Sequence, residues 1–194
     1  MNPPMSSGRR KGVESSETRA QLLRSAVQIL GEEGAAAVTA RRLAEQVGLG
    51  RHIVHYYFGT IDEVFVAIMR EEGARTQAAL AEATKTGDAL EILWENARTA
   101  APVILELMQL GLRHPAIARE YKVYTERFRE AMSQVLSAYA EERGLRLPAS
   151  PAATAVLLQS VAFTAAIEGQ FDLSMGHAEA EARLLAWLKG EGEA

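Results

Sequence analysis

The stretch that decides the fold is residues 39–58, which read TARRLAEQVGLGRHIVHYYF. Two runs suited to short helices lie on either side of Gly48-Leu49-Gly50, and glycine adopts the left-handed backbone of a tight turn more easily than other residues. Thr39 can cap the first run with its hydroxyl. Two short helices joined in this way, behind another helix, are typical of a helix-turn-helix, whose last helix enters the major groove of DNA.

Outward from this stretch, the sequence predicts helices and no strands. Apolar residues recur at three- and four-residue spacing, first at Ala20, Leu23, Val27 and Leu30, before Gly34 stops that helix. The apolar residues expected to hold the three-helix head together are Val47, Leu49, Val54 and Phe58. We expect an all-α protein of about nine helices. Eight helical stretches can be located, at residues 15–34, 39–47, 51–57, 60–85, 88–111 with a kink at Pro102, 115–144, 152–169 and 178–189.

Charge divides the chain into a basic head and an acidic body. Residues 1–60 hold eight Lys or Arg against five Asp or Glu, residues 61–194 hold thirteen against twenty, and the formal net charge is −4. If this asymmetry is not chance, only the head is suited to meet phosphates. We expect a flexible basic arm at 1–14, a DNA-binding head at 15–60, and a larger helical ligand-binding and dimerisation domain at 61–194, with the helix at about 61–85 as its connector.

Composition argues against several other classes of protein. A hydrophobic fraction of 48% and a charged fraction of 24% suit a globular protein with a core. The chain has no cysteine, which excludes disulfides, thiolate metal sites and a Cys nucleophile. No stretch approaches eighteen uncharged apolar residues and no secretory signal is recognised, so we expect a cytoplasmic protein with no membrane partner. Without a Glu-x-x-His motif, a phosphate loop or a convincing Ser/His/Asp set, we expect no enzyme, cofactor or metal.

A denser pattern runs from Thr18 to about Met69. Its members are Leu23, Ala26, Leu30, Gly34, Val38-Thr39, Leu43-Ala44, Val47-Gly48-Leu49, Tyr57-Phe58 and Asp62-Glu63-Val64. This pattern resembles the TetR family of transcriptional regulators, and the rest of the chain is similar to that family only in the number and order of its helices. The resemblance implies a head that grips operator DNA, a helical pocket for a small molecule, and a dimer formed by the last two long helices.

The resemblance also places the DNA contacts on the second and third helices of the head. Arg51 and His52 would approach base edges or phosphates, His55 and Tyr57 would bind phosphates, and Ile53 could touch a thymine methyl. The helix start at Thr39 is a natural phosphate site. The candidate DNA-binding residues are Thr39, Ala40, Arg41, Arg42, Gly50, Arg51, His52, Ile53, His55, Tyr56 and Tyr57. The alternative for the two histidines is a pair of solvated residues or a weak metal site.

Three positions depart from the family pattern. The chain has His55 where tyrosine is usual, Gly50 where serine is common, and Ile61 where a lysine usually sits. His55 keeps a donor, and Gly50 should weaken a helix cap only slightly. Ile61 removes a phosphate contact, so DNA affinity would depend more on Arg41, Arg42 and the basic residues at 9–11, whose alternative role is that of a solubilising tail.

The body offers material for an effector site and for a dimer. The candidate pocket mixes aromatic bulk with a few polar groups, which suits a mostly apolar ligand; its residues are Trp94, Arg98, Met108, Tyr121, Tyr124, Phe128, Phe163 and Glu168, with His114 as a further polar anchor. The last two helices would form a self-complementary surface around a two-fold axis, through Leu158, Ala162, Ala165, Gly169, Leu184, Trp187 and Leu188. The alternative places both sets in an intramolecular core.

Taken together, the patterns predict a sequence-specific DNA-binding regulator. Its simplest form is a homodimeric repressor that leaves a palindromic operator when a small, mostly apolar effector binds. The expected partners are double-stranded operator DNA, a second copy of the chain and that effector. Two alternatives stay open: a regulator without a small-molecule ligand, and a helical adaptor that has lost DNA binding, as Ile61 would allow.

Overall fold

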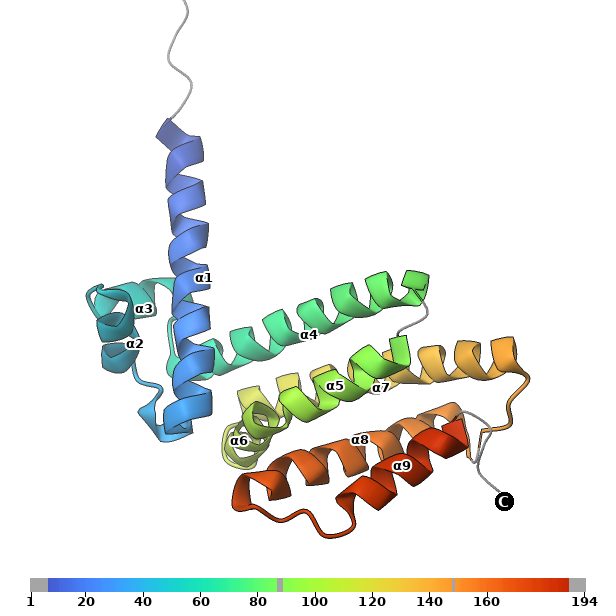
Figure 1. The fold of residues 1–194 in the computed structure, drawn as a ribbon. Coiled ribbons are helices and arrows are strands. Elements are labelled where there is room, and N and C mark those ends of the chain that lie inside the picture. Colours follow the sequence, from blue (N-terminus) through green and yellow to red (C-terminus); the bar gives the residue numbers. More distant parts are fainter. Residues whose placement is uncertain (1–6, 87–88, 148, 189–194) are drawn as a thin grey trace, which may run out of the picture. The chain divides into compact units, whose positions relative to one another are not determined.

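The computed structural model describes residues 7–86, 89–147 and 149–188 (Figure 1). Over these residues the chain forms nine α-helices and two short 3-10 helices without a strand, so the predicted all-α class is confirmed. Contacts divide the chain into two compact units. Unit 1 comprises Met1–Ile68 with Glu106–Ala118, and unit 2 comprises Met69–Leu105 with Arg119–Ala194. This division differs from the expected boundary at residue 60, because Glu106–Ala118 packs with the head.

Unit 1 contains the three helices of the head, which Figure 1 shows lying together. They are α1 (Ser7–Glu33), α2 (Ala40–Val47) and α3 (His52–Phe58), with the 3-10 helix η1 (Ala35–Ala37) between the first two. Leu49, which was expected in the core, is 39% exposed because it follows the glycine that ends α2. The buried apolar residues of the head are Leu22, Leu23, Ala26, Ile29, Leu30, Val38, Leu43, Ala44, Val54 and Phe58.

Helix α1 begins earlier than the sequence predicts. It starts at Ser7 rather than at residue 15, so residues 7–14 of the expected flexible arm are helical. Residues 1–6 of that arm lie outside the described residues. Gly34 follows α1 with a φ of 82°, a conformation that L side chains rarely adopt, and the predicted stop at this glycine is confirmed.

Helix α4 (Ile61–Thr86) continues from unit 1 into unit 2. The predicted kinked helix at 88–111 is instead two helices, α5 (Ala89–Thr99) and α6 (Ala101–Gly111). Pro102 explains the break, because proline donates no backbone hydrogen bond and disfavours helical geometry at the residue before it.

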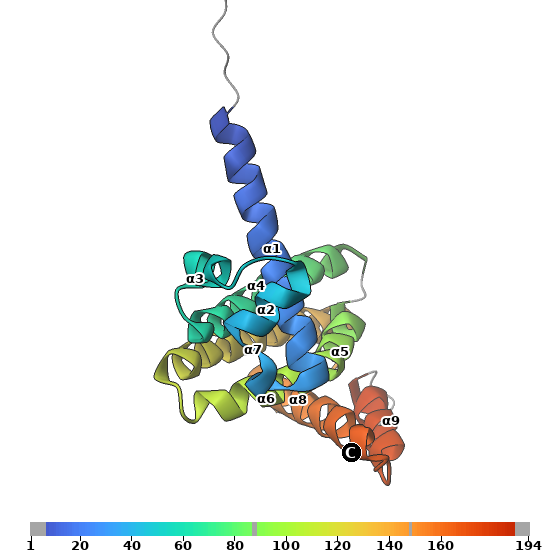
Figure 2. The same ribbon diagram turned by 90° about the vertical axis from the view of Figure 1, so that its left-hand side faces the viewer.

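Unit 2 is built from four further helices around one apolar core. Helix α5 and most of α7 (Pro115–Arg143) are joined there by α8 (Pro151–Glu168) and α9 (His177–Leu188), with the 3-10 helix η2 (Gly169–Phe171) after α8. Figure 2 shows α8 and α9 side by side. The buried core consists of Leu80, Leu93, Trp94, Phe128, Met132, Leu136, Ala155, Leu158, Ala162 and Leu188.

Helix α8 is unusually apolar along its length. Among the described residues, Pro151–Phe171 is the stretch long and apolar enough to cross a membrane, judged by length and composition. The expectation that no segment reaches this length is therefore wrong. One face of α8, with Thr154, Ala155, Leu158 and Ala162, is nevertheless buried in unit 2, where the helix packs against α5 and α9. We interpret α8 as a core helix with a second, outward apolar face.

Candidate functional site

A capped glycine turn holds α3 against α2. Gly48 has φ 69° and ψ 29°, which is the left-handed conformation. Its N–H donates to the carbonyl of Glu45 at 3.2 Å, and the N–H of Leu49 donates to the carbonyl of Ala44 at 2.8 Å. These two bonds form the Schellman motif, which satisfies the last carbonyls of a helix. The predicted glycine turn is confirmed, and it fixes the direction in which α3 leaves α2.

Burial distinguishes the two faces of α3. Val54 and Phe58 are almost fully buried in the head. On α1, the guanidinium of Arg19 covers the Phe58 ring, with its Cζ 5.0 Å from the ring centroid, a cation–π contact that no local sequence signal could reveal. The opposite face carries the exposed residues Arg51, His52, His55 and Tyr56, with Ile53 and Tyr57 half-buried beside them.

The two histidines on this outer face are held by neighbouring backbone. The ring of His52 lies over Gly50, because a Cβ at position 50 would come within 2.7 Å of the His52 Cε1. Glycine therefore leaves the space that this imidazole fills. Nδ1 of His55 lies 2.9 Å from the carbonyl of Gly59, to which it donates, so Nε2 is left for an outside partner. No group of three or more potential metal ligands occurs among the residues that the structure describes.

The start of α2 is capped as predicted. Oγ1 of Thr39 accepts a hydrogen bond from the N–H of Arg42 at 3.1 Å. Thr39 is exposed and Ala40 begins the helix. A helix N-terminus carries a partial positive charge and further amide donors, so it suits a phosphate. The cap is confirmed, whereas the phosphate contact stays a prediction.

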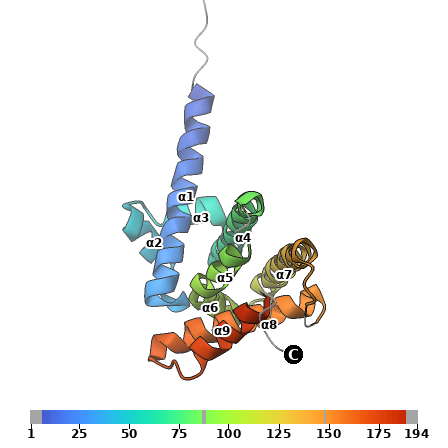
Figure 3. The same cartoon turned by 45° about the vertical axis from the view of Figure 1, so that its right-hand side comes forward.

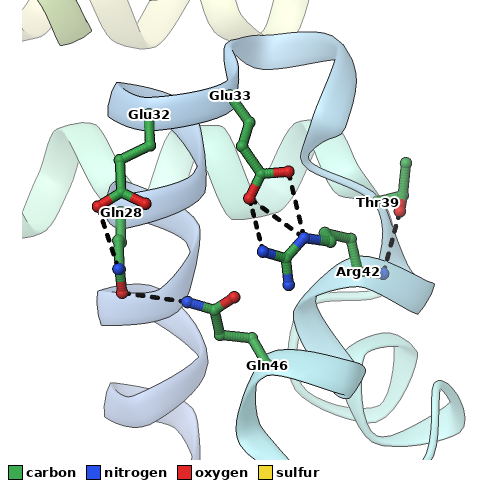
Figure 4. A network of polar contacts seen from close by, with 6 residues as sticks. All are labelled: Gln28, Glu32, Glu33, Thr39, Arg42 and Gln46. Carbon is green, nitrogen blue, oxygen red and sulfur yellow. Dashed lines mark hydrogen bonds and ion pairs between the residues drawn. The ribbon is translucent and has the colours of Figure 1, made fainter.

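Arg42 is bound to Glu33 at the end of α1 (Figure 4). Its Nη2 lies 2.6 Å from Oε1, and its Nε lies 3.2 Å from each carboxylate oxygen. The hydrogen bond from Arg42 holds the pKa of the Glu33 carboxyl below its usual value, and the same bond raises the pKa of Arg42. A guanidinium engaged at two points connects α1 with α2. We therefore reassign Arg42 from the DNA contacts to a positioning role.

Two amides form a second set of contacts between α1 and α2. Nε2 of Gln46 on α2 donates to Oε1 of Gln28 on α1 at 3.1 Å, and Nε2 of Gln28 donates to Glu32 at 3.1 Å (Figure 4). Arg41 differs from its neighbour Arg42, because its side chain is 84% exposed and its Nε lies 3.6 Å from the carboxylate of Glu45 one turn along the helix. Such exposed pairs contribute little, so Arg41 can turn toward a phosphate.

Two contacts attach the end of α6 and the start of α7 to the head within unit 1. Oε2 of Glu106 accepts from the N–H of Ala35 at 3.0 Å, at the beginning of η1. Nδ1 of His114 lies 3.0 Å from Oδ2 of Asp62 in the first turn of α4. The sequence suggested His114 as an anchor for the effector, but its described partner is Asp62. These contacts join residues too far apart in sequence for periodicity to connect them.

Unit 2 contains a groove between α4 and α7, which Figure 3 shows as neighbours. A smaller hollow of about 100 Å³ is lined chiefly by Arg70, Gly73, Thr76, Glu120, Tyr124, Arg127 and Phe128. A larger hollow of about 440 Å³ lies along the same two helices and shares Gln77, Leu80 and Ala131 with the first; its other residues are Ala81, Gln134, Val135 and Ala138. We call the two hollows together the α4–α7 groove.

Polar groups gather in the smaller hollow of this groove. Nη2 of Arg70 lies 2.7 Å from Oε2 of Glu120. Burial, and after it the negative charge of Glu72, raises the pKa of Tyr124 to about 12. The phenol therefore stays protonated at neutral pH and is available as a donor. Gly73 faces the Tyr124 ring, because a Cβ there would lie 3.5 Å from the ring carbon Cδ2.

The groove contains two of the eight predicted pocket residues, Tyr124 and Phe128. Trp94 lies in the core of unit 2, where its Nε1 donates to Oε1 of Glu181 on α9 at 3.1 Å. Arg98 lies 3.6 Å from the same carboxylate oxygen. The pair therefore connects α5 with α9 instead of lining the groove.

The other predicted pocket residues are scattered. Met108 is exposed on α6 in unit 1. Tyr121 and Phe163 are half-buried and lie outside the groove lining. Oε2 of Glu168 lies 2.7 Å from Nε2 of His177, so this pair bridges the two ends of the loop between α8 and α9. An aromatic stripe at helical spacing thus marked α7 correctly as a lining helix but could not identify α4 as the opposite wall.

Three of the seven predicted dimer residues belong to the interior of unit 2. Leu158, Ala162 and Leu188 are at most 2% exposed in its core, so they cannot meet a partner, which corrects that part of the prediction. Ala165, Leu184 and Trp187 are half-buried, and Gly169 is exposed. The outward stripe of α8 consists instead of Ala153, Val156, Leu157, Ser160 and Thr164. Both faces of α8 are apolar, so the sequence pattern could not distinguish them.

The geometry defines a helix-turn-helix head followed by further helices. Comparison with known proteins shows which proteins share this head. Residues 22–68 match the model of the bacterial regulatory proteins of the tetR family. The head is therefore similar to this family over the residues matched. The chain is similar to the HTH-type transcriptional repressor AcnR of Corynebacterium glutamicum, with 31% identity over 37% of this chain and 38% of that protein. It is also similar to the HTH-type transcriptional regulator BetI of Brucella canis, with 32% identity over 34% of this chain and 35% of that protein. These matches span little more than a third of the relatives' length.

The fold of nearly the whole chain has counterparts among solved structures. A transcriptional regulator from Saccharomonospora viridis, solved in complex with choline, aligns with a TM-score of 0.74 at 16% identity over 90% of this chain and 96% of that chain. The transcriptional regulator FadR from Bacillus subtilis, in complex with stearoyl-CoA, aligns with a TM-score of 0.65 at 14% identity over 88% and 98%. At this identity the likeness concerns the fold alone.

Proposed function

We propose that this chain is a homodimeric transcriptional repressor whose hold on operator DNA is controlled by a small molecule bound in unit 2. The observation that carries the proposal is the exposed, donor-rich face of α3 on a head that matches the tetR family. Arg51 would donate two hydrogen bonds to a guanine, and His52 would contact an adjacent base or phosphate. Tyr57, Arg41 and the amides at the start of α2 would position the head on phosphates.

A second copy is needed because a palindromic site is read by two heads related by a two-fold axis. The outward stripe of α8 supports that role, since residues at this spacing lie on one helix face. Val156 and Leu157 are 39% and 48% exposed and are the largest apolar side chains of the stripe. Small residues beside them let another helix approach closely.

Control by an effector would act through α4. This helix carries Asp62 in the head unit and lines the α4–α7 groove farther along with Gly73 and Leu80. A ligand in the groove would favour the state in which α4 tilts and the two recognition helices no longer match successive major grooves, about 34–36 Å apart. The coupling is reciprocal, so operator DNA weakens effector binding by the same factor.

The test begins with selection of bound fragments from random double-stranded DNA by the purified chain. We expect enrichment of a palindrome whose half-sites lie one helical turn apart. Arg51→Ala should weaken binding to that palindrome by about ten- to a hundredfold, because a bidentate base contact contributes about 1–3 kcal/mol of discrimination. Arg119→Ala, which removes an equal charge from the exposed surface of α7, should leave binding unchanged.

Oligomeric state is measured in parallel by light scattering. Leu157→Glu should convert the dimer to a monomer and abolish tight binding to the palindrome, while the isolated subunit keeps its helical circular dichroism. Failure to enrich any sequence, or equal loss from Arg51→Ala and Arg119→Ala, would defeat the assignment of α3. A dimer that persists in Leu157→Glu would place the interface elsewhere.

A further inference from the structure

The α4–α7 groove has one charged end and one apolar end. Its charged lining residues, Arg70, Glu120 and Arg127, all belong to the smaller hollow. The larger hollow is lined by apolar residues and two amides, and it contains no charged side chain among the described residues. A groove with this polarity matches a molecule that has a charged group at one end and an apolar chain behind it.

The charge at the polar end favours an anion. The side chain of Glu120 is 14% exposed and its carboxylate is already paired with Arg70 at 2.7 Å. Arg127 lies two helical turns after Glu120 on α7, is exposed, and adds a positive charge to the same hollow. A cationic ligand would need an unpaired carboxylate, but Glu120 is paired with Arg70. Glu72, whose charge acts on Tyr124, is paired with Arg75. An anion meets Arg127 and the neutral phenol of Tyr124, both of which line this hollow.

The apolar end of the groove sets the length of the ligand's alkyl chain. Leu80 and Ala131 belong to both hollows, so they connect the charged end with the larger hollow. Beyond them lie Ala81, Val135 and Ala138, whose apolar side chains line the larger hollow. The larger hollow, about 440 Å³, falls within the range of about 300–1,000 Å³ that is usual for small-molecule sites.

We propose that the α4–α7 groove binds a medium-chain carboxylate. Its carboxylate lies between the guanidinium of Arg127 and the hydroxyl of Tyr124, and its alkyl chain runs past Leu80 and Ala131 toward Ala138. This inference rests on the proposed function, because it names the class of the effector that would act through α4.

The binding test uses the full-length protein without DNA and isothermal titration calorimetry. The probes are octanoate, butyrate and octyltrimethylammonium. Octanoate should bind on the order of a hundredfold more tightly than butyrate, since each additional buried methylene raises affinity by about fourfold. It should also bind at least tenfold more tightly than octyltrimethylammonium, which has an alkyl chain one carbon longer and the opposite charge.

Two variants locate the ends of the ligand. Arg127→Gln should lower octanoate affinity at least tenfold, whereas Lys122→Gln, which removes an equal charge from the same helix at a residue paired with Glu126 outside the groove, should not change it. Ala131→Phe should fill the junction of the hollows and reduce the difference between octanoate and butyrate. Unchanged melting temperatures of Arg127→Gln and Lys122→Gln show that both are folded.

Octanoate binding that is absent, weaker than that of octyltrimethylammonium, or equal in Arg127→Gln and the parent protein would overturn the assignment of the groove. Release of the selected palindrome is measured separately, by adding octanoate to the protein–DNA complex. If the protein binds its palindrome but not octanoate, this inference fails and DNA binding stands. If octanoate binds as expected yet does not release the palindrome, the proposed control through α4 fails and the ligand class stands.

Discussion

The head and the helical body of this chain are specified at different levels of detail. The family model matches residues 22–68, within and just after the head. AcnR and BetI share 31% and 32% of 71 and 69 aligned residues with this chain, whereas the two fold relatives share 16% and 14% over almost the whole chain. A major groove has fixed dimensions and admits a helix in few orientations, so the packing of α3 tolerates little variation. The body must only bury a core and keep its helix order, which many apolar combinations achieve. The residues that line its groove are free to vary with the proposed effector.

A core truncation in each region has the largest expected effect on this difference between head and body. Leu43→Ala on α2 and Leu136→Ala on α7 each remove a fully buried leucine side chain. Each should lower the free energy of unfolding by about 2–5 kcal/mol, through lost burial and the cavity left behind. We expect Leu43→Ala to abolish DNA binding while the dimer and octanoate binding persist, and Leu136→Ala to weaken octanoate binding first.

Chemical denaturation followed by circular dichroism gives the stability of both variants, and calorimetry and DNA retardation give the two activities. The control is Leu112→Ala, because Leu112 is 88% exposed and its truncation removes no buried surface. If Leu43→Ala and Leu136→Ala impair both activities to the same extent, the two regions unfold as one and the distinction drawn above is wrong.

The sequence predicted the head at nearly residue level because its signals are local. A glycine turn, a threonine cap and buried positions on α3 each depend on neighbours within a few residues, and Gly48, Thr39, Val54 and Phe58 behave as predicted. Arg42 shows the limit even here. Its basic side chain predicted a DNA contact, but Glu33 on another helix binds it, and a partner on another helix has no local signature.

The groove of the body could not be predicted from the sequence, because it lies between α4 and α7, which are far apart in the sequence. The stripe of α7 gave Tyr124 and Phe128, but Gly73, Leu80 and Arg127 become lining residues only when α4 lies beside α7. The two faces of α8 raise the same difficulty, since Leu157 and Leu158 are equally apolar and only packing exposes one and buries the other. Sequence periodicity predicts which residues share a helix face, but it does not predict which other helix packs against that face.

The adjacent residues Arg41 and Arg42 of α2 allow a test within the head, because one is expected to contact DNA and the other to connect α1 with α2. Arg41→Gln should reduce the slope of log affinity against log salt concentration by about one, as expected when one phosphate contact is lost. Arg42→Gln should leave that slope unchanged, because Glu33 already holds Arg42, and should instead lower the stability of the head. Retardation of the selected palindrome at several salt concentrations measures both slopes. Equal slopes for the two variants would return Arg42 to the DNA contacts.

The smallest expected effect is the pH dependence of the Glu33–Arg42 pair. The pKa of Glu33 is lowered in the folded head from an ordinary value of 4.5, so the carboxylate stabilises the fold above that pH, and this contribution disappears as the pH falls through the lower folded pKa. Glu33→Gln keeps the shape but removes the charge. The parent protein should therefore exceed Glu33→Gln in stability at pH 7, by a margin that shrinks below pH 4.5 and in high salt, since the pair is exposed. Denaturation at pH 7 and at pH 3 measures this margin. A margin that stays constant would mean that packing or amide hydrogen bonds, and not charge, connect α1 with α2.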